Sequence, residues 1–92
     1  MKANDRSWFL YVVQCSDDTL YTGVTTDLSR RMHEHNTTAR GAKYTKARRP
    51  VKLIYWVGHE NRSTAQKAEC QFKKLTRVQK EEIIKGRKMF HG

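Results

Sequence analysis

Two predicted helices place three reactive side chains on or beside their apolar faces. At about 100° per residue, Arg31 and His35 share the side of the first helix that carries Leu28. Arg30 falls roughly on the opposite side. In the later helix, Glu69 lies at the edge of an apolar stripe. Solvation of the surface does not explain charges in such places, so Arg31, His35 and Glu69 are candidates for chemistry.

A guanidinium, an imidazole and a carboxylate together suit the cleavage of a phosphodiester. The carboxylate can hold a divalent cation, the guanidinium can neutralise charge that grows in the transition state, and the imidazole can move a proton. Each residue also has a structural interpretation. Arg31 could lay its stem along the core, His35 could be a hydrogen-bonded core histidine, and Glu69 could pair with Lys73 one turn later.

The composition indicates one small, strongly basic domain. The chain has 92 residues, with 19 Lys and Arg against 9 Asp and Glu and a formal net charge of +10. Segments 27–52, with eight basic and two acidic residues, and 62–92, with nine and three, carry most of this charge. We expect a single domain over residues 1–92, with a core at about 8–85 and a loose tail at 86–92. A polyanion is the expected partner.

The sequence gives no sign of a membrane segment, a signal peptide or a bound zinc ion. No apolar run reaches the roughly 18–20 residues that cross a bilayer, so we expect a cytoplasmic protein without a membrane partner. Cys15 and Cys70 form neither a disulfide framework nor a tight metal-ligand spacing, and the histidines form no zinc motif. We expect both thiols to be reduced and partly buried.

Three segments have the composition of strands. Residues 8–13 and 20–25 are separated by a polar turn and predict an antiparallel pair, and 51–57 predict a third strand. Gly23 interrupts the second strand, which marks a point where a backbone or a ligand comes close. Residues 37–49 are polar and basic, so we expect a loop there with one irregular turn around Tyr44.

Three helices complete the predicted fold. Asp27 is the expected N-cap of a helix that ends near Asn36, and Ser63 that of a helix running to about Leu75. Thr76, with a glutamine three residues later, has the form of a capping box before a helix at 78–85. The order β-β-α-β-α-α predicts an α+β domain, with a small, mainly antiparallel three-stranded sheet flanked by helices.

Several short motifs, taken in order, resemble the GIY-YIG nuclease superfamily. They are Phe9-Leu10-Tyr11, Tyr21-Thr22-Gly23, Asp27-Leu28-Ser29-Arg30-Arg31 and His35-Asn36. The later helix is similar to the family's glutamate-bearing helix through Ala68-Glu69 and Phe72-Lys73-Lys74. The resemblance covers Trp8 to about Leu75 and is closest to the short stand-alone bacterial members, the YhbQ-like group.

The resemblance implies a role for each matching residue. Tyr11 and Tyr21 would face the scissile phosphate, and Arg31 would steady its charge. Glu69 would hold one divalent cation, Mg²⁺ or Mn²⁺. Tyr11 or His35 would help to deprotonate the attacking water, and we place Tyr11 slightly ahead as the base.

The basic loop, parts of two helices and one glycine are expected to contact nucleic acid. These residues are Gly23, Arg30, Lys43, Tyr44, Lys46, Arg48, Arg49 and Lys73. The chain departs from the family pattern where the first tripeptide lacks Gly-Ile and where Val24 replaces a lysine of some members. It also has no asparagine after Asn61, although some members use a late asparagine.

As a whole, the resemblance implies a metal-dependent endonuclease that hydrolyses phosphodiester bonds, in DNA rather than RNA. We expect structure-selective or weakly specific cleavage in DNA repair or recombination, because the chain ends soon after the region of resemblance. An activating protein partner is compatible with this interpretation. The alternative is a nucleic-acid-binding module with weak or no catalysis, which the missing asparagine favours. A third interpretation takes the basic faces as a surface for acidic proteins or ribosomal RNA.

Overall fold

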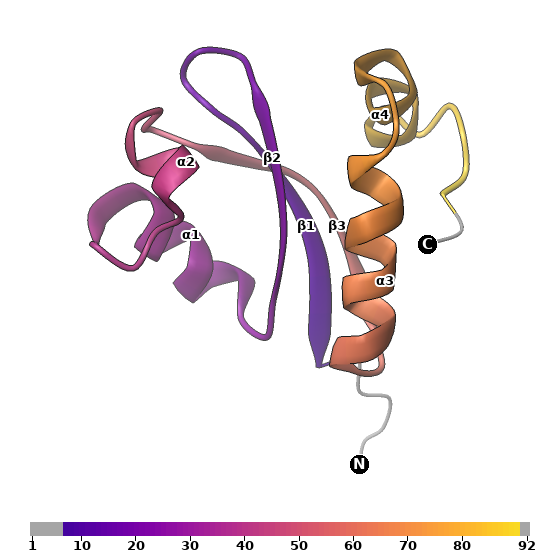
Figure 1. Cartoon of the computed structure of the whole chain (residues 1–92), viewed down its shortest axis with the longest axis horizontal. Coiled ribbons are helices and arrows are strands. Elements are labelled where there is room, and N and C mark those ends of the chain that lie inside the picture. The colour runs from indigo at the N-terminus through magenta and orange to yellow at the C-terminus, as the bar shows by residue number, and fades with distance from the viewer. Residues whose placement is uncertain (1–6, 91–92) are drawn as a thin grey trace.

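The computed structural model describes residues 7–90 and builds them around a three-stranded antiparallel sheet (Figure 1). The strands are β1 (Trp8–Gln14), β2 (Leu20–Thr25) and β3 (Lys52–His59), in the order β2-β1-β3. The register sets Tyr11 of β1 opposite Gly23 of β2 and Trp56 of β3. The predicted α+β architecture is confirmed.

The central strand β1 is buried on both faces, as its aromatic and β-branched sequence predicts. Successive side chains point to opposite faces, so the strand contributes to two cores. Tyr11 and Val13 pack with Leu28 and Met32 on one face. Val12 packs with Phe72 on the other.

Four helices cover these two faces. They are α1 (Leu28–Thr37), α2 (Lys43–Lys46), α3 (Arg62–Lys73) and α4 (Arg77–Ile84). In Figure 1, α1 and α2 lie on one side of the sheet, and α3 lies on the other with α4 beyond its end. No helix among residues 7–90 is long and apolar enough to cross a membrane.

The caps explain where the helices begin. Asp27 accepts a hydrogen bond from the Arg30 amide, and Thr76 forms the predicted capping box with Gln79. The predicted N-cap of α3 is wrong. Asn61 takes that position instead of Ser63, because its side-chain oxygen accepts the Thr64 amide at 2.9 Å and the helix begins at Arg62.

Three further predictions need correction. The third strand continues through Gly58 to His59, and the irregular turn near Tyr44 is a one-turn helix, α2. Cys70 is exposed, because it lies on the outer side of α3, whereas Cys15 is buried in the core.

The segment predicted as a loose tail contains a core contact. The ring of Phe90 packs edge-on against the buried ring of Phe72, with 5.4 Å between their centroids. Residues 91 and 92 lie outside the described part. Phe90 therefore adds to the core that Phe72 of α3 and Ile83 of α4 form.

We predict that Phe90→Ala lowers the free energy of unfolding by about 1–2 kcal/mol, since it removes a partly buried aromatic side chain. The neighbouring Met89 is exposed, so Met89→Ala is the matched control and should change stability by less than about 0.5 kcal/mol. Urea unfolding followed by circular dichroism measures both. Equal stabilities of the two variants would contradict the packing role of Phe90.

Candidate active site

The ring of Tyr11 lies across Gly23 at the edge of the sheet. A Cβ atom at residue 23 would come within 2.6 Å of the Tyr11 hydroxyl oxygen and 2.8 Å of Cζ. No side chain fits there while the Tyr11 ring keeps its place, because such distances are far below van der Waals contact. The glycine that the sequence marks as a point of close approach is therefore needed by Tyr11 itself, from the neighbouring strand.

Arg31 and Arg30 take the two sides of α1 that the helical periodicity predicts. The Arg31 side chain is 22% exposed and the Arg30 side chain 54% exposed. Arg31 Nε donates to the Tyr11 hydroxyl at 3.4 Å, and Nη1 donates to Glu34 Oε1 at 2.9 Å and to the Arg40 carbonyl at 2.8 Å. These bonds hold the guanidinium beside the phenol.

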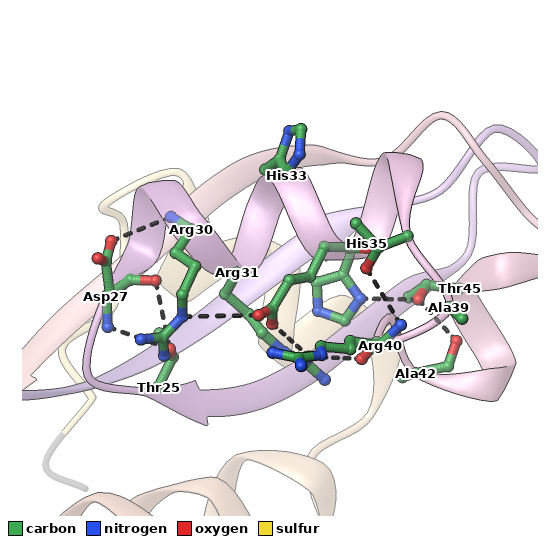
Figure 2. Close-up of polar contacts among 12 residues, drawn as sticks. Thr25, Asp27, Arg30, Arg31, His33, His35, Ala39, Arg40, Ala42 and Thr45 are labelled. Atoms are coloured by element: carbon green, nitrogen blue, oxygen red, sulfur yellow. Dashed lines mark hydrogen bonds and ion pairs between the residues drawn. The ribbon is translucent and has the colours of Figure 1, made fainter.

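His35 belongs to the same hydrogen-bonded group and lies in the core. Its ring has no exposed surface, and its Nε2 atom lies 2.7 Å from the Tyr11 hydroxyl oxygen. Its Nδ1 atom lies 2.7 Å from Oγ1 of Thr45. Figure 2 shows His35 directed from α1 toward Thr45, whereas His33 points away from this group.

Burial sets the protonation of both buried groups. It raises the pKa of Tyr11 to about 12; the neighbouring Arg31 opposes this shift, and charges on Tyr21 and Glu69 add to it. It also lowers the pKa of His35 to about 4, and the positive charge of Arg31 acts in the same direction. At neutral pH the tyrosine is therefore a phenol and the histidine a neutral imidazole.

Glu69 approaches this group from the other layer of the domain. It lies on α3, its side chain is 22% exposed, and its Oε2 atom is 3.2 Å from the Lys73 ammonium. The predicted ion pair is therefore present. The negative charge of Glu69 makes a small contribution to the raised pKa of Tyr11.

The partly buried carboxylate of Glu69 is a suitable ligand for Mg²⁺ or Mn²⁺, but it is not a complete site. Within residues 7–90, no three His, Cys, Asp or Glu side chains are grouped to hold a metal ion. Mg²⁺ commonly binds through one or two carboxylates, retained waters and substrate phosphates. Glu69 fits that mode, and Lys73 is exposed enough to move aside from it.

Aromatic rings extend the group toward the surface. The Tyr21 ring meets the His35 ring edge-on, with 5.5 Å between the ring centroids, and stacks on the Tyr44 ring at a centroid distance of 5.9 Å. The Arg48 guanidinium lies 3.8 Å from the centre of the Tyr44 ring and pairs with Asp17 at 3.0 Å. The predicted residues Tyr21, Tyr44 and Arg48 thus form one stack beside the buried histidine.

Three of the predicted phosphate-binding residues donate to backbone carbonyls in this structure. Arg48 Nη1 donates to the Tyr44 carbonyl at 3.0 Å. Arg49 donates to the carbonyls of His35 and Thr38, both at 2.5 Å, and so caps the end of α1. Lys46 Nζ donates to the Ala39 carbonyl at 3.4 Å. These contacts compete with phosphate for the donors of all three side chains.

Sequence reasoning missed two members of the site. Thr45 carries the second hydrogen bond of His35, and Glu34 holds the Arg31 guanidinium. The position of Glu34, three residues after Arg31 on one helix, was a usable signal. No local spacing predicted the contact of Thr45 with His35, because it joins two separate helices, α2 and α1.

The buried His35 predicts a pH dependence of stability. Its pKa is about 4 in the folded protein against 6.5 in an unfolded chain, so the unfolded state binds more protons between these values. The contribution of neutral His35 to the free energy of unfolding is fully present above pH 6.5. It is lost as the pH drops toward 4, by roughly 3 kcal/mol in all.

Urea unfolding between pH 7 and 4.5 tests this expectation against His35→Gln, which cannot titrate. The free energy of unfolding should fall more steeply in the unmodified protein. Parallel profiles would show that His35 is not held neutral by burial.

Known proteins share both this sequence pattern and this fold. A family model described as the GIY-YIG catalytic domain matches residues 7–82. The UPF0213 protein SAG0778 of Streptococcus agalactiae is 51% identical over 80 residues, which cover 87% of this chain and 90% of that protein. The UPF0213 protein DP2720 of Desulfotalea psychrophila is 49% identical over 80 residues, or 87% of this chain and 73% of that protein.

Two solution NMR structures match as well. The protein EF2693 of E. faecalis has a TM-score of 0.60 at 49% identity, with 90% of this chain and 88% of that chain covered. The UPF0213 protein BH0048 of Bacillus halodurans has a TM-score of 0.56 at 34% identity, with 87% and 84% covered. The motifs, the sheet and these relatives agree that the chain belongs to the GIY-YIG family, among its short bacterial UPF0213 proteins.

Proposed function

We propose that this protein is a metal-dependent endonuclease that hydrolyses phosphodiester bonds in DNA. The observation that carries the proposal is the hydrogen-bonded line Arg31–Tyr11–His35, in which a cation, a phenol and a neutral imidazole follow one another. The cation stabilises charge on the phosphate, and the phenol and imidazole provide a route for a proton. A core that serves packing alone does not require a cation, a phenol and an imidazole joined by hydrogen bonds.

His35 acts on water only through Tyr11, because its ring is buried. A water that attacks phosphorus gives a proton to the Tyr11 oxygen while the phenol passes its own proton to His35 Nε2. An oxygen–phosphorus bond forms, and the leaving oxygen departs with the electron pair of the broken bond and takes a proton from solvent. This relay avoids a free phenolate, which a pKa of about 12 makes scarce at neutral pH.

A divalent cation held by Glu69 would supply Lewis-acid stabilisation of the phosphate and its leaving oxygen. Arg31 lies on the opposite layer and supplies a second positive charge to the same phosphate. Its bonds to Glu34 and to the Arg40 carbonyl orient it in advance, so it loses little freedom when substrate binds.

The net charge of +10 supports a nucleic-acid substrate. Selective cleavage would come from the shape and flexibility of DNA, since one small domain offers little surface for reading a long sequence. Branched DNA formed in repair or recombination and an activating protein partner both fit this proposal. So does action in the cytoplasm.

The two arginines of α1 should separate catalysis from binding. Arg31→Ala should reduce the cleavage rate by about 10²–10³-fold with nearly unchanged affinity, because it removes charge stabilisation in the transition state. Arg30→Ala should mainly weaken binding. Single-turnover cleavage and fluorescence anisotropy measure the two effects, and the reverse pattern would reject the assigned role of Arg31.

Removal of the Glu69 carboxylate should abolish metal-dependent cleavage. We expect Glu69→Gln to be inactive over the whole range of Mn²⁺ and Mg²⁺ concentrations, and to bind DNA at least as tightly because it loses a negative charge. The exposed Glu60 gives the control Glu60→Gln, which should cleave like the unmodified protein.

Labelled single-stranded, duplex and branched DNA provide the substrate panel. If the unmodified protein and Glu69→Gln both bind but neither cleaves any member, the endonuclease proposal fails. That result would support the alternative, a DNA-binding module built on the same site.

A further inference from the structure

The side chain of Thr45 is buried between α2 and the histidine of the candidate site. It has no exposed surface. Its Oγ1 atom lies 2.7 Å from His35 Nδ1 and donates to the Ala42 carbonyl at 2.9 Å. The hydroxyl thus meets one partner that can only accept and one that can either donate or accept.

The single proton of the hydroxyl decides the tautomer of His35. Because Thr45 gives this proton to the Ala42 carbonyl, its oxygen must accept from His35 Nδ1. A neutral imidazole carries one proton, so Nδ1 is protonated and Nε2 presents a lone pair. That lone pair faces the Tyr11 hydroxyl at 2.7 Å.

The Nε2-protonated tautomer would reverse the direction of the hydrogen bond between His35 and Tyr11. A proton on Nε2 would be donated to the Tyr11 oxygen, which already accepts from Arg31 Nε. The Tyr11 oxygen would then accept from both Arg31 and His35, and His35 would offer no acceptor for the phenol proton. Tyr11 could not pass its proton inward while it took one from water.

The backbone brings Thr45 to this position through a close approach of the loop to α1. A Cβ atom at Gly41 would lie 2.8 Å from the Glu34 carbonyl oxygen and 3.0 Å from Cα of His35. Glycine therefore allows the chain to pass directly against the helix. The Ala42 carbonyl is fixed as well, because it also accepts the Lys46 amide at 3.0 Å.

We infer that Thr45 is a positioning residue that fixes the Nδ1-protonated tautomer of His35 and so sets the direction of proton transfer from Tyr11. The inference about catalysis rests on the proposed endonuclease function. The inference about the tautomer does not, because it concerns the free protein. The two can therefore fail separately.

NMR of protein labelled with ¹⁵N-histidine tests the tautomer directly. In the unmodified protein at pH 7, His35 should show the Nδ1-protonated pattern of two-bond couplings. Thr45→Ser keeps the hydroxyl and should keep this pattern, whereas Thr45→Val has a similar shape without an acceptor and should lose it. The buried Thr22, which lies on β2 outside this line, gives the control Thr22→Val, in which the pattern should persist.

Cleavage kinetics provide the second measurement. Thr45→Val should lower kcat by about 10–100-fold, the range typical of hydrogen-bond partners that orient histidines at metal sites, with KM changed less than about twofold. Thr45→Ser should restore most of kcat. A purely structural role would instead affect the serine and valine variants through stability alone.

The outcomes are distinct. An Nε2-protonated His35 in the unmodified protein overturns the inference, even if the valine variant does not fold. So does a valine variant that keeps both the tautomer and kcat. If the predicted tautomer pattern is found but no DNA is cleaved, the positioning of His35 by Thr45 stands and the endonuclease proposal fails.

Discussion

Tyr11 and His35 are polar side chains in a region from which water is excluded, so each must find its hydrogen-bond partners within the protein. An unpaired buried polar group costs about 1–3 kcal/mol, a large share of the stability of so small a domain. The phenol bonds to the imidazole, and the remaining capacity of each is met by Arg31 and Thr45. This requirement brings β1, α1 and α2 together in one arrangement, and the same arrangement aligns groups that could transfer a proton.

Several of the basic side chains make contacts that stabilise the fold, so they are not free to bind a substrate. Arg49 closes the end of α1 by binding its carbonyls, and Arg48 joins the loop to Asp17 in the turn between β1 and β2. Arg77 pairs with Glu81 and donates to the Asp18 carbonyl, which ties α4 to the same turn. The positive charge at the surface is thus partly a set of fixed structural contacts, while Arg31 is the arginine held against the buried phenol.

Local patterns predicted the features that depend on neighbours along the chain. Helical spacing separated Arg31 from Arg30, and the cap at Asp27 needed only the sequence beside it. The sequence beside α3 predicted Ser63 as its cap, but Asn61 takes that place. Where the helix begins depends on where β3 ends, which the local pattern did not predict. The contacts of Phe90 and Thr45 could not be predicted in this way, because each joins segments whose approach is set by packing of the whole domain. The candidate site was therefore predictable by residue type, but its hydrogen bonds were not.

The position of Gly23 gives a physical reason why the candidate site lies at an edge of the sheet. Tyr11 lies on the central strand with its ring packed on the α1 face, and Glu69 lies on α3 at the other face, yet the charge of Glu69 contributes to the raised pKa of Tyr11. β2 is one of the two outer strands, and the missing side chain at Gly23 lets the phenol lie across it toward that edge. A further strand paired with β2 would cover this place.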